Sequence, residues 1–256
     1  MGKVYLVGAG PGAADLITLR GAELLRRADV VFHDALVQPE LLALARDAKR
    51  IAVGKRCSRI STDQRFINRN LIDAARKHEV VVRLKGGDPM LFGRAYEEIV
   101  ALEAAGVPFE IVPGVTSGLA ASADIAVSLT RRGASRSVVF ATPRIGEGED
   151  VSDWAPAVVA ADTAVLYMAL GQAAEVAAIL ESHGMAPTAP VILVENASLP
   201  DSRHLGTTLR GLQNGVASTM MAPALMLLGE VFRNRADALM DAESAPSQMR
   251  YALPLA

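Results

Sequence analysis

The stretch VVVRLKGGDPMLFGR, residues 80–94, joins an apolar run to a turn rich in glycine. Val80 to Leu84 predict a buried β-strand, because the run is almost entirely apolar and turn residues follow it directly. Gly86 and Gly87 then end the strand with a backbone freedom that residues carrying a Cβ atom lack. The stretch therefore predicts that another group approaches this backbone closely.

An alternation of strand, loop and helix recurs on both sides of this stretch. Such an alternation implies a parallel sheet covered by helices. The apolar residues Leu19, Ala22 and Leu25 have helical spacing, and Pro113-Gly114 end a strand in FEIVPG and provide a hinge. The other predicted elements are strands at 4–7, 29–32 and 50–53 and helices at 39–45, 67–77 and 96–105.

A second α/β domain is expected beyond the hinge. GLAASADI and residues 172–183 predict helices, whereas SVVFAT, AVLYMAL, PVILVEN and PALMLLGEV predict strands. Residues 142–162 predict an exposed loop with a helix entry, in which Trp154 packs rather than binds a ligand. We therefore expect domains at 1–114 and 115–243, and a loosely held tail at 244–256.

The bulk composition excludes several classes of protein. The 256 residues carry a net charge of −2, so the chain lacks the basic surplus of a nucleic-acid-binding protein. Cys57 is the single cysteine, which fits a reducing compartment, and the strand pattern at the amino terminus makes the cytoplasm the expected location. No apolar run is long enough for a membrane span, and no spacing of histidines and acids suggests a metal site.

The glycine loop GAGPGA, residues 8–13, allows a nicotinamide interpretation. Gly8, Gly10 and Ala13 fit G-x-G-x-x-A after a strand, and Asp34 lies where an acid could bind a ribose. Against this, Pro11-Gly12 fall where the phosphate-binding helix should begin, and helical periodicity starts only near Thr18. A purely structural turn is equally compatible with the loop.

Several short motifs follow one another along the chain in a fixed order. Each alone is weakly specific, but together they resemble the tetrapyrrole methyltransferases, most closely the branch that methylates uroporphyrinogen III. The resemblance covers roughly residues 3–235. The motifs are GAGPG (8–12), HDALV (33–37), VGKR (53–56), GGDPMLFGR (86–94), PGVTS (113–117), LYMAL (166–170) and LVEN (193–196).

The resemblance implies that S-adenosylmethionine binds in a cleft between two α/β domains, the tetrapyrrole methylase fold. Glycines at the GGD turn would let a cofactor approach the backbone, and Asp88 would offer a carboxylate, although a turn capped by Asp88 explains the same residues. Ala197 stands where relatives carry glycine. The cofactor contacts implied are Pro11, Gly86, Gly87, Asp88, Leu91, Thr116, Ser117, Met168 and Ala197.

The resemblance also implies the catalytic pair, with Asp34 as the base and Lys55 as the proton donor. Without it, Asp34 would be interpreted as a loop cap and Lys55 as a surface charge. The eight carboxylates of uroporphyrinogen III call for arginines, for which Arg94, Arg131 and Arg132 are candidates, and Glu97 could orient Arg94. The alternative is an exposed Arg94–Glu97 helical pair and a solvated turn at Arg131-Arg132.

The resemblance implies transfer of two methyl groups to uroporphyrinogen III, at C-2 and C-7, to give precorrin-2, by a homodimeric enzyme. Departures from the family pattern at GRAYEE (93–98), Thr130-Arg131-Arg132 and Thr142-Pro143-Arg144 keep a later corrinoid precursor open as the substrate. A ribose methyltransferase of the same fold, an NAD(P)-dependent oxidoreductase and a non-catalytic ligand sensor are more distant alternatives.

Overall fold

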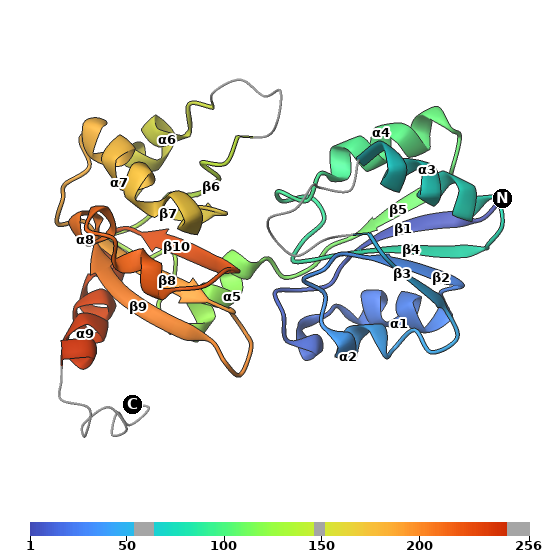
Figure 1. The fold of residues 1–256 in the computed structure, drawn as a ribbon, viewed down its shortest axis with the longest axis horizontal. Coiled ribbons are helices and arrows are strands. Elements are labelled where there is room, and N and C mark those ends of the chain that lie inside the picture. Colours follow the sequence, from blue (N-terminus) through green and yellow to red (C-terminus); the bar gives the residue numbers. More distant parts are fainter. Residues whose placement is uncertain (54–63, 146–151, 245–256) are drawn as a thin grey trace. The chain divides into compact units, whose positions relative to one another are not determined.

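The computed structural model describes residues 1–53, 64–145 and 152–244 of the chain. The chain divides into two compact units, Met1–Ser117 and Gly118–Ala256. Each unit has its own five-stranded sheet (Figure 1), which confirms the predicted α/β class. Residues 245–256 of the expected tail lie outside the described residues.

The sheet of the first unit is entirely parallel, with the strand order β3-β2-β4-β1-β5. Its central strand β4 includes the VVVRL run and is almost completely buried, as expected for a strand with helices on both faces. The strands are β1 (Lys3–Gly8), β2 (Val30–His33), β3 (Lys49–Ala52), β4 (Val80–Lys85) and β5 (Phe109–Val112).

Helices cover both faces of this sheet, as Figure 1 shows, and each face has its own hydrophobic core. Leu71 and Leu102 pack on one face, and Leu25 and Leu41 on the other. The predicted helix at 39–45 is too long, because after Leu42 the backbone changes to hydrogen bonds between residues three apart. The helical elements are η1 (Ala14–Leu16), α1 (Leu19–Arg27), α2 (Pro39–Leu42), α3 (Gln64–Ala75) and α4 (Ala95–Ala104).

The sheet of the second unit is mixed, with the order β6-β7-β10-β8-β9. Only β6 and β7 pair in parallel, whereas β10 pairs antiparallel with β7 and β8, and β8 with β9. The strands are β6 (Val138–Ala141), β7 (Thr163–Tyr167), β8 (Pro190–Glu195), β9 (Arg203–Thr208) and β10 (Ala224–Leu228).

One face of this second sheet packs its alternating residues, such as Leu166 and Leu193, against Leu180 and the other apolar residues of a large core. On the other face a Cβ atom at Gly118 would lie 2.5 Å from the Tyr167 hydroxyl oxygen, so close packing there requires glycine. The helical elements are α5 (Ser117–Asp124), α6 (Trp154–Ala160), η2 (Leu170–Gln172), α7 (Ala173–Ser182), α8 (Leu209–Gln213), η3 (Val216–Thr219), η4 (Glu230–Phe232) and α9 (Arg233–Ser244).

Several elements of the second unit were not predicted. β9 and α9 have too few apolar residues to show a period, and they form because β9 extends the sheet beside β8 and α9 packs on β9. The strand expected in AVLYMAL ends at Tyr167, because Met168 has a φ of 57° and leaves the β region. Trp154 begins α6 and packs against the core, as predicted.

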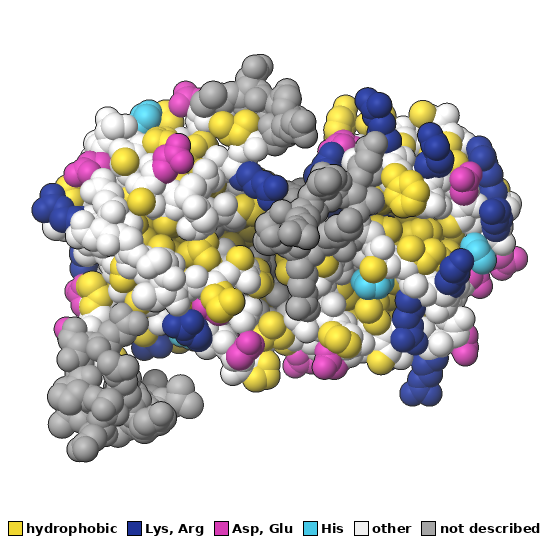
Figure 2. Space-filling model, in the orientation of Figure 1, with side chains coloured by type: hydrophobic (Ala, Val, Ile, Leu, Met, Phe, Trp, Pro, Cys, Tyr) yellow, Lys and Arg dark blue, Asp and Glu magenta, His cyan; other side chains and the backbone are white. Residues whose placement is uncertain are grey.

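Surface charge is mixed on the visible face of each unit, where Lys and Arg side chains lie among acidic and neutral ones (Figure 2). This distribution agrees with the near-neutral net charge of −2. Among the described residues, no helix combines the length and the apolar character that a membrane crossing needs.

Two substitutions on α3 compare its buried and exposed sides. Leu71 is fully buried, so Leu71→Ala should lower the free energy of unfolding by about 2–5 kcal/mol through lost contacts and a residual cavity. Phe66 on the same helix is 56% exposed, so Phe66→Ala should change that free energy by no more than about 0.5 kcal/mol. Urea denaturation measures both, and equal losses would contradict the packing described for α3.

Candidate active site

The carboxyl ends of the parallel strands bring several predicted site residues to one edge of the first sheet. Asp34 follows β2 and donates its backbone N–H to the Leu84 carbonyl of β4 at 3.2 Å. Its side-chain Oδ2 lies 3.4 Å from the backbone nitrogen of Gly86. Ligands of open α/β sheets bind at this edge, and the structure places Asp34 beside the GGD turn there.

The loops after β1, β4 and β5 touch through their backbones. Gly10 and Gly87 exchange two hydrogen bonds, of 3.2 and 2.8 Å. A Cβ atom at Gly8 would lie 2.5 Å from the Gly114 Cα and 2.8 Å from the Gly87 carbonyl oxygen, so side chains are excluded there. The group that approaches Gly87 is therefore the protein's own backbone. Gly8 and Gly114 were not predicted as site residues, although Gly8 ends β1 and Gly114 comes two residues after β5.

Gly86, unlike Gly87, has no protein backbone packed closely against it among the described residues. Within the part of the chain that the structure describes, a Cβ atom at Gly86 would have only the Leu36 Cβ atom nearby, at 3.8 Å. Position 87 instead requires glycine, because its φ is 66°. Neither the packing of the described residues nor the backbone conformation explains a glycine at position 86. The space beside Gly86 suits a group that lies against the backbone at the edge of the sheet.

Asp88 closes the turn with both oxygens of its carboxylate. Oδ1 accepts a hydrogen bond from the Met90 N–H at 2.8 Å, and Oδ2 accepts one from the Gly114 N–H at 2.9 Å. Leu91 continues this turn by donating its N–H to the Asp88 carbonyl. The structure thus supports the capping interpretation of Asp88, while each carboxylate oxygen retains a second lone pair.

Asp34 is the outermost of a chain of four charged side chains. Arg83 Nη2 donates to Asp34 Oδ1 at 2.6 Å, and Arg83 Nε donates to Glu98 Oε1 at 2.9 Å. Lys85 Nζ donates to Glu98 Oε2 at 2.9 Å. Arg83 and Lys85 share one face of β4 because side chains alternate along a strand. These residues were missed, although two cations within a buried strand were a visible signal.

Burial and charge act against each other in this chain of residues. Burial alone lowers the pKa of the Arg83 guanidinium, but the Asp34 and Glu98 carboxylates outweigh burial and raise that pKa above its ordinary value. Burial, together with the neighbouring Arg83 charge, lowers the pKa of the Lys85 ammonium despite its bond to Glu98. Arg83 therefore remains a cation at the end of β4.

The predicted substrate residues lie on the surface of the protein. Arg94 and Glu97 form a bidentate pair with distances of 2.7 and 2.8 Å, in which both side chains are largely exposed. Arg94 has a φ of 55°, a left-handed conformation that is costly for a residue with a side chain. Arg131 and Arg132 lie in an exposed turn, closed by hydrogen bonds between Arg131 and Ser135.

In the second unit, the predicted cofactor positions coincide with strained backbone. Met168 follows β7 with a φ of 57°, and its side chain is 44% exposed rather than part of the core. Ala197 follows β8 and is buried, between Asn196 with a φ of 52° and Ser198 with a φ of 71°. Such conformations concentrate at binding sites.

The remaining predicted positions are less informative. Pro11 is half-buried in the loop after β1, and Ser117 is the first residue of α5, directly after Thr116.

Tyr167 was not predicted from the sequence as a site residue. Its hydroxyl accepts the Gly118 N–H at 3.0 Å, near the start of α5. Lys55 lies outside the described residues, so its position is not part of the site described here.

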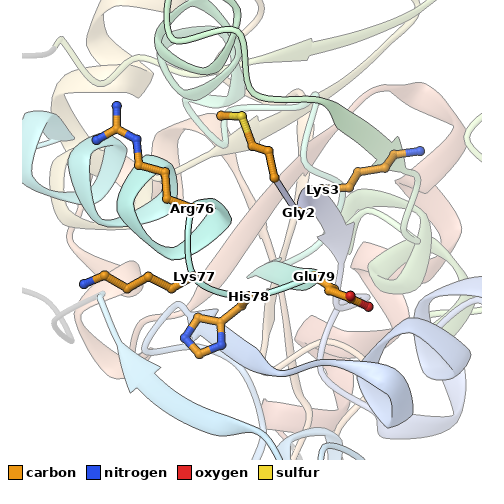
Figure 3. A pocket seen from close by; sticks show the side chains of 7 residues that line it. Gly2, Lys3, Arg76, Lys77, His78 and Glu79 are labelled. Atoms are coloured by element: carbon orange, nitrogen blue, oxygen red, sulfur yellow. The ribbon is translucent and has the colours of Figure 1, made fainter.

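A hollow of about 400 Å³ lies at the opposite, amino edge of the first sheet. Lys3, Arg76, Lys77, His78 and Glu79 contribute to its lining, and Figure 3 shows their side chains pointing away from one another. Binding sites need polar groups that converge, so this hollow is not the candidate site. Within residues 1–53, 64–145 and 152–244 no cluster of His, Cys, Asp and Glu could hold a metal ion.

Comparisons with known proteins point to one family. Residues 3–213 match the family model described as Tetrapyrrole (Corrin/Porphyrin) Methylases. Siroheme synthase 1 of Cronobacter sakazakii is 45% identical over 231 residues, which are 90% of this chain and 49% of that protein. The chain therefore spans about half the length of the curated relatives it matches.

Two solved structures extend the comparison to the fold. A uroporphyrin-III C-methyl transferase from Thermus thermophilus, complexed with S-adenyl homocysteine, is 41% identical with a TM-score of 0.81. The match covers 91% of this chain and 100% of that one. A cobalt precorrin-4 methyltransferase is 30% identical with a TM-score of 0.74, over 90% of this chain and 95% of that one.

Gly86 provides a test of whether the turn binds the expected cofactor. Gly86→Ala should leave the melting temperature nearly unchanged, because among the described residues its methyl group meets only Leu36. It should weaken binding of S-adenosylhomocysteine roughly 5- to 100-fold if the ligand occupies that space. Calorimetric titration measures the affinity. Unaltered affinity would show that no ligand contacts this glycine.

Proposed function

The chain belongs to the tetrapyrrole (corrin/porphyrin) methylase family, and we propose on this premise that it transfers methyl groups from S-adenosylmethionine to carbon atoms of uroporphyrinogen III. The observation that carries the proposal is the match to the Thermus thermophilus transferase, which extends over the full length of that chain. The two methylations take place at C-2 and C-7 and give precorrin-2.

The residues at the GGD turn fit the proposed cofactor. Among the described residues, only Leu36 lies near a Cβ position at Gly86, and the Gly10–Gly87 hydrogen bonds tie the turn to the loop after β1. When bound, S-adenosylmethionine supplies a methyl group on a positively charged sulfonium. The residues we propose for its contacts are Pro11, Gly86, Gly87, Asp88, Leu91, Thr116, Ser117, Met168 and Ala197.

For the proposed methyl transfer, this chain has to position the two reactants and accept a proton. A bond forms between a pyrrole carbon and the methyl carbon while the sulfur–methyl bond breaks, and the ring system then loses a proton. Alignment of the reacting atoms contributes roughly 7–11 kcal/mol in well-oriented reactions, and a positioned base about 10²- to 10⁴-fold in rate. Asp34 is the proposed base, because its carboxylate lies at the sheet edge beside Gly86 and is 31% exposed. Lys55 is the proposed proton donor.

Exposed arginines support a substrate with eight carboxylates. We propose Arg94, oriented by its bidentate bond to Glu97, together with Arg131 and Arg132, as the groups that bind the substrate. A guanidinium forms two parallel hydrogen bonds with a carboxylate, each contributing on the order of 1.5–3 kcal/mol. The costly left-handed conformation of Arg94 is consistent with such a role.

The nicotinamide alternative loses support from the structure. A dinucleotide site needs a helix that begins directly at the glycine loop, so that its amino terminus faces the pyrophosphate. Here η1 follows the loop and α1 begins only at Leu19. Asp34, the expected ribose ligand in that interpretation, instead binds Arg83.

A later corrinoid precursor remains the second candidate substrate. The similarity to a cobalt precorrin-4 methyltransferase favours it, but at 30% identity that protein resembles this chain less than the uroporphyrin-III enzyme does. The departures at Ala95-Tyr96 and Pro143-Arg144 are the places where substrate choice would differ. Arg144 extends toward Met168, with its Nη1 atom 3.9 Å from the sulfur.

The first experiment is anaerobic incubation of the protein with S-adenosylmethionine and freshly generated uroporphyrinogen III. Mass spectrometry should show a gain of two methyl groups and a proportional release of S-adenosylhomocysteine, with no gain when the protein is omitted. If the cofactor binds but uroporphyrinogen III gains no methyl group, this substrate is wrong and the corrinoid alternative becomes the proposal.

We also propose that the protein is a cytoplasmic homodimer. A single cysteine suits a reducing compartment. Tyr96 and Val100 are exposed apolar residues on α4, and they provide apolar surface for an assembly. Light scattering after size-exclusion chromatography should give twice the chain mass of 26.9 kDa. A mass of one chain at micromolar concentration would refute the dimer.

A further inference from the structure

The four-charge chain Asp34–Arg83–Glu98–Lys85 differs in burial from other ion pairs of the first unit. Its Glu98, Lys85 and Arg83 side chains are 0%, 2% and 4% exposed, whereas the Arg94 side chain of the neighbouring pair is 53% exposed. Placing charges in a protein interior is costly even when they are paired, and apolar replacements of such pairs are often neutral or stabilising. Stability alone therefore does not explain why this interior holds three charges.

The Arg83 guanidinium uses all three of its nitrogen atoms. Nε binds Glu98, Nη2 binds Asp34, and Nη1 donates to the Leu84 carbonyl at 3.2 Å. A planar group bound on three sides has one orientation, so its Nη2 points in one direction. Arg83 thereby places the Oδ1 atom of Asp34.

Glu98 is fixed in turn by two further donors. Lys85 binds its Oε2, and Gln64 of α3 donates to its Oε1 at 3.2 Å. The Gln64 amide also donates to Asn68 Oδ1 at 3.1 Å. Glu98, the residue that anchors Arg83, therefore connects α4 with α3. The hydrogen bonds continue from this interior to Asp34, the member of the chain that is partly exposed.

We propose that Arg83, anchored by Glu98 and Lys85, is a positioning residue that orients the Asp34 carboxylate for proton removal from the substrate. This inference rests on the proposed function, in which Asp34 is the base. Arg83 donates a hydrogen bond to Oδ1 of Asp34. The contact of Asp34 Oδ2 among the described residues is longer, 3.4 Å from the Gly86 nitrogen. In the step, the electrons of the bond to the departing proton neutralise the positive charge that methylation leaves on the ring system, and the proton passes to Oδ2.

A double-mutant cycle between Arg83 and Asp34 tests the proposal. Arg83→Met should lower kcat by about 10²-fold, the cost of a misplaced catalytic group, with the affinity for S-adenosylhomocysteine unchanged within about twofold. In the Asp34→Asn background the same substitution should lower kcat no more than about twofold, because the carboxylate that Arg83 positions is gone. Equal losses in both backgrounds would overturn the positioning role.

The cycle separates this inference from the proposed function. If Asp34→Asn retains the kcat of the original protein, Asp34 is not the base, and the positioning role falls with it. If Asp34→Asn is impaired but the two substitutions act independently, only the positioning role fails. Methyl gain in the product assay establishes the reaction itself in either case.

Two further variants control for folding and charge. Arg83→Lys retains a buried cation but cannot bridge two carboxylates, so we expect a kcat loss of at least about tenfold with the affinity for S-adenosylhomocysteine retained. The original kcat in this variant would overturn the proposal, because charge without the guanidinium geometry would then suffice. Arg76→Met removes an arginine from the exposed pair with Asp73 and should leave kcat unchanged.

Discussion

Backbone contact between three turns is the constraint on which the candidate site depends. Gly8, Gly87 and Gly114 approach one another so closely that no Cβ atom fits between Gly8 and Gly114, and Gly10 pairs with Gly87 like a short piece of sheet. Each turn continues a different parallel strand. Their contact therefore fixes the carboxyl edge of the first sheet as one rigid surface, on which Asp34 and the open position at Gly86 lie side by side.

Charge is arranged around this surface in two ways. Behind it, Arg83, Glu98 and Lys85 are buried, and each has several partners, which gives them one geometry. On the surface of the same unit, the exposed Arg94 pairs with the exposed carboxylate of Glu97. A rigid interior pair suits the orientation of a reacting group, whereas an exposed pair suits exchange of ligands.

In the second unit, the turns after the strands contain strained residues with side chains, whereas the turns of the first unit contain glycines. Met168, Asn196 and Ser198 adopt left-handed conformations at the ends of β7 and β8, each with a cost to the fold. The Asp124 carboxylate offsets part of that cost by accepting the Ser198 N–H at 2.7 Å and the Ser202 hydroxyl at 3.0 Å. The family resemblance singled out Met168 and Ala197, and the strain adds a physical reason to place a ligand there.

The sequence by itself determined the strands of the first unit, its parallel class and the turn at Gly86–Asp88, because apolar runs and glycines act over neighbouring residues. It could not show β9 and α9, because their residues have no apolar period. It could not show the Gly114 hydrogen bond to Asp88 or the bond between Arg83 and Asp34 either, because these partners are distant in the chain. Only packing of the sheet brings Asp34 next to Arg83, across a separation of 49 residues. Local periodicity carries no information about such contacts, and the tertiary structure alone decided them.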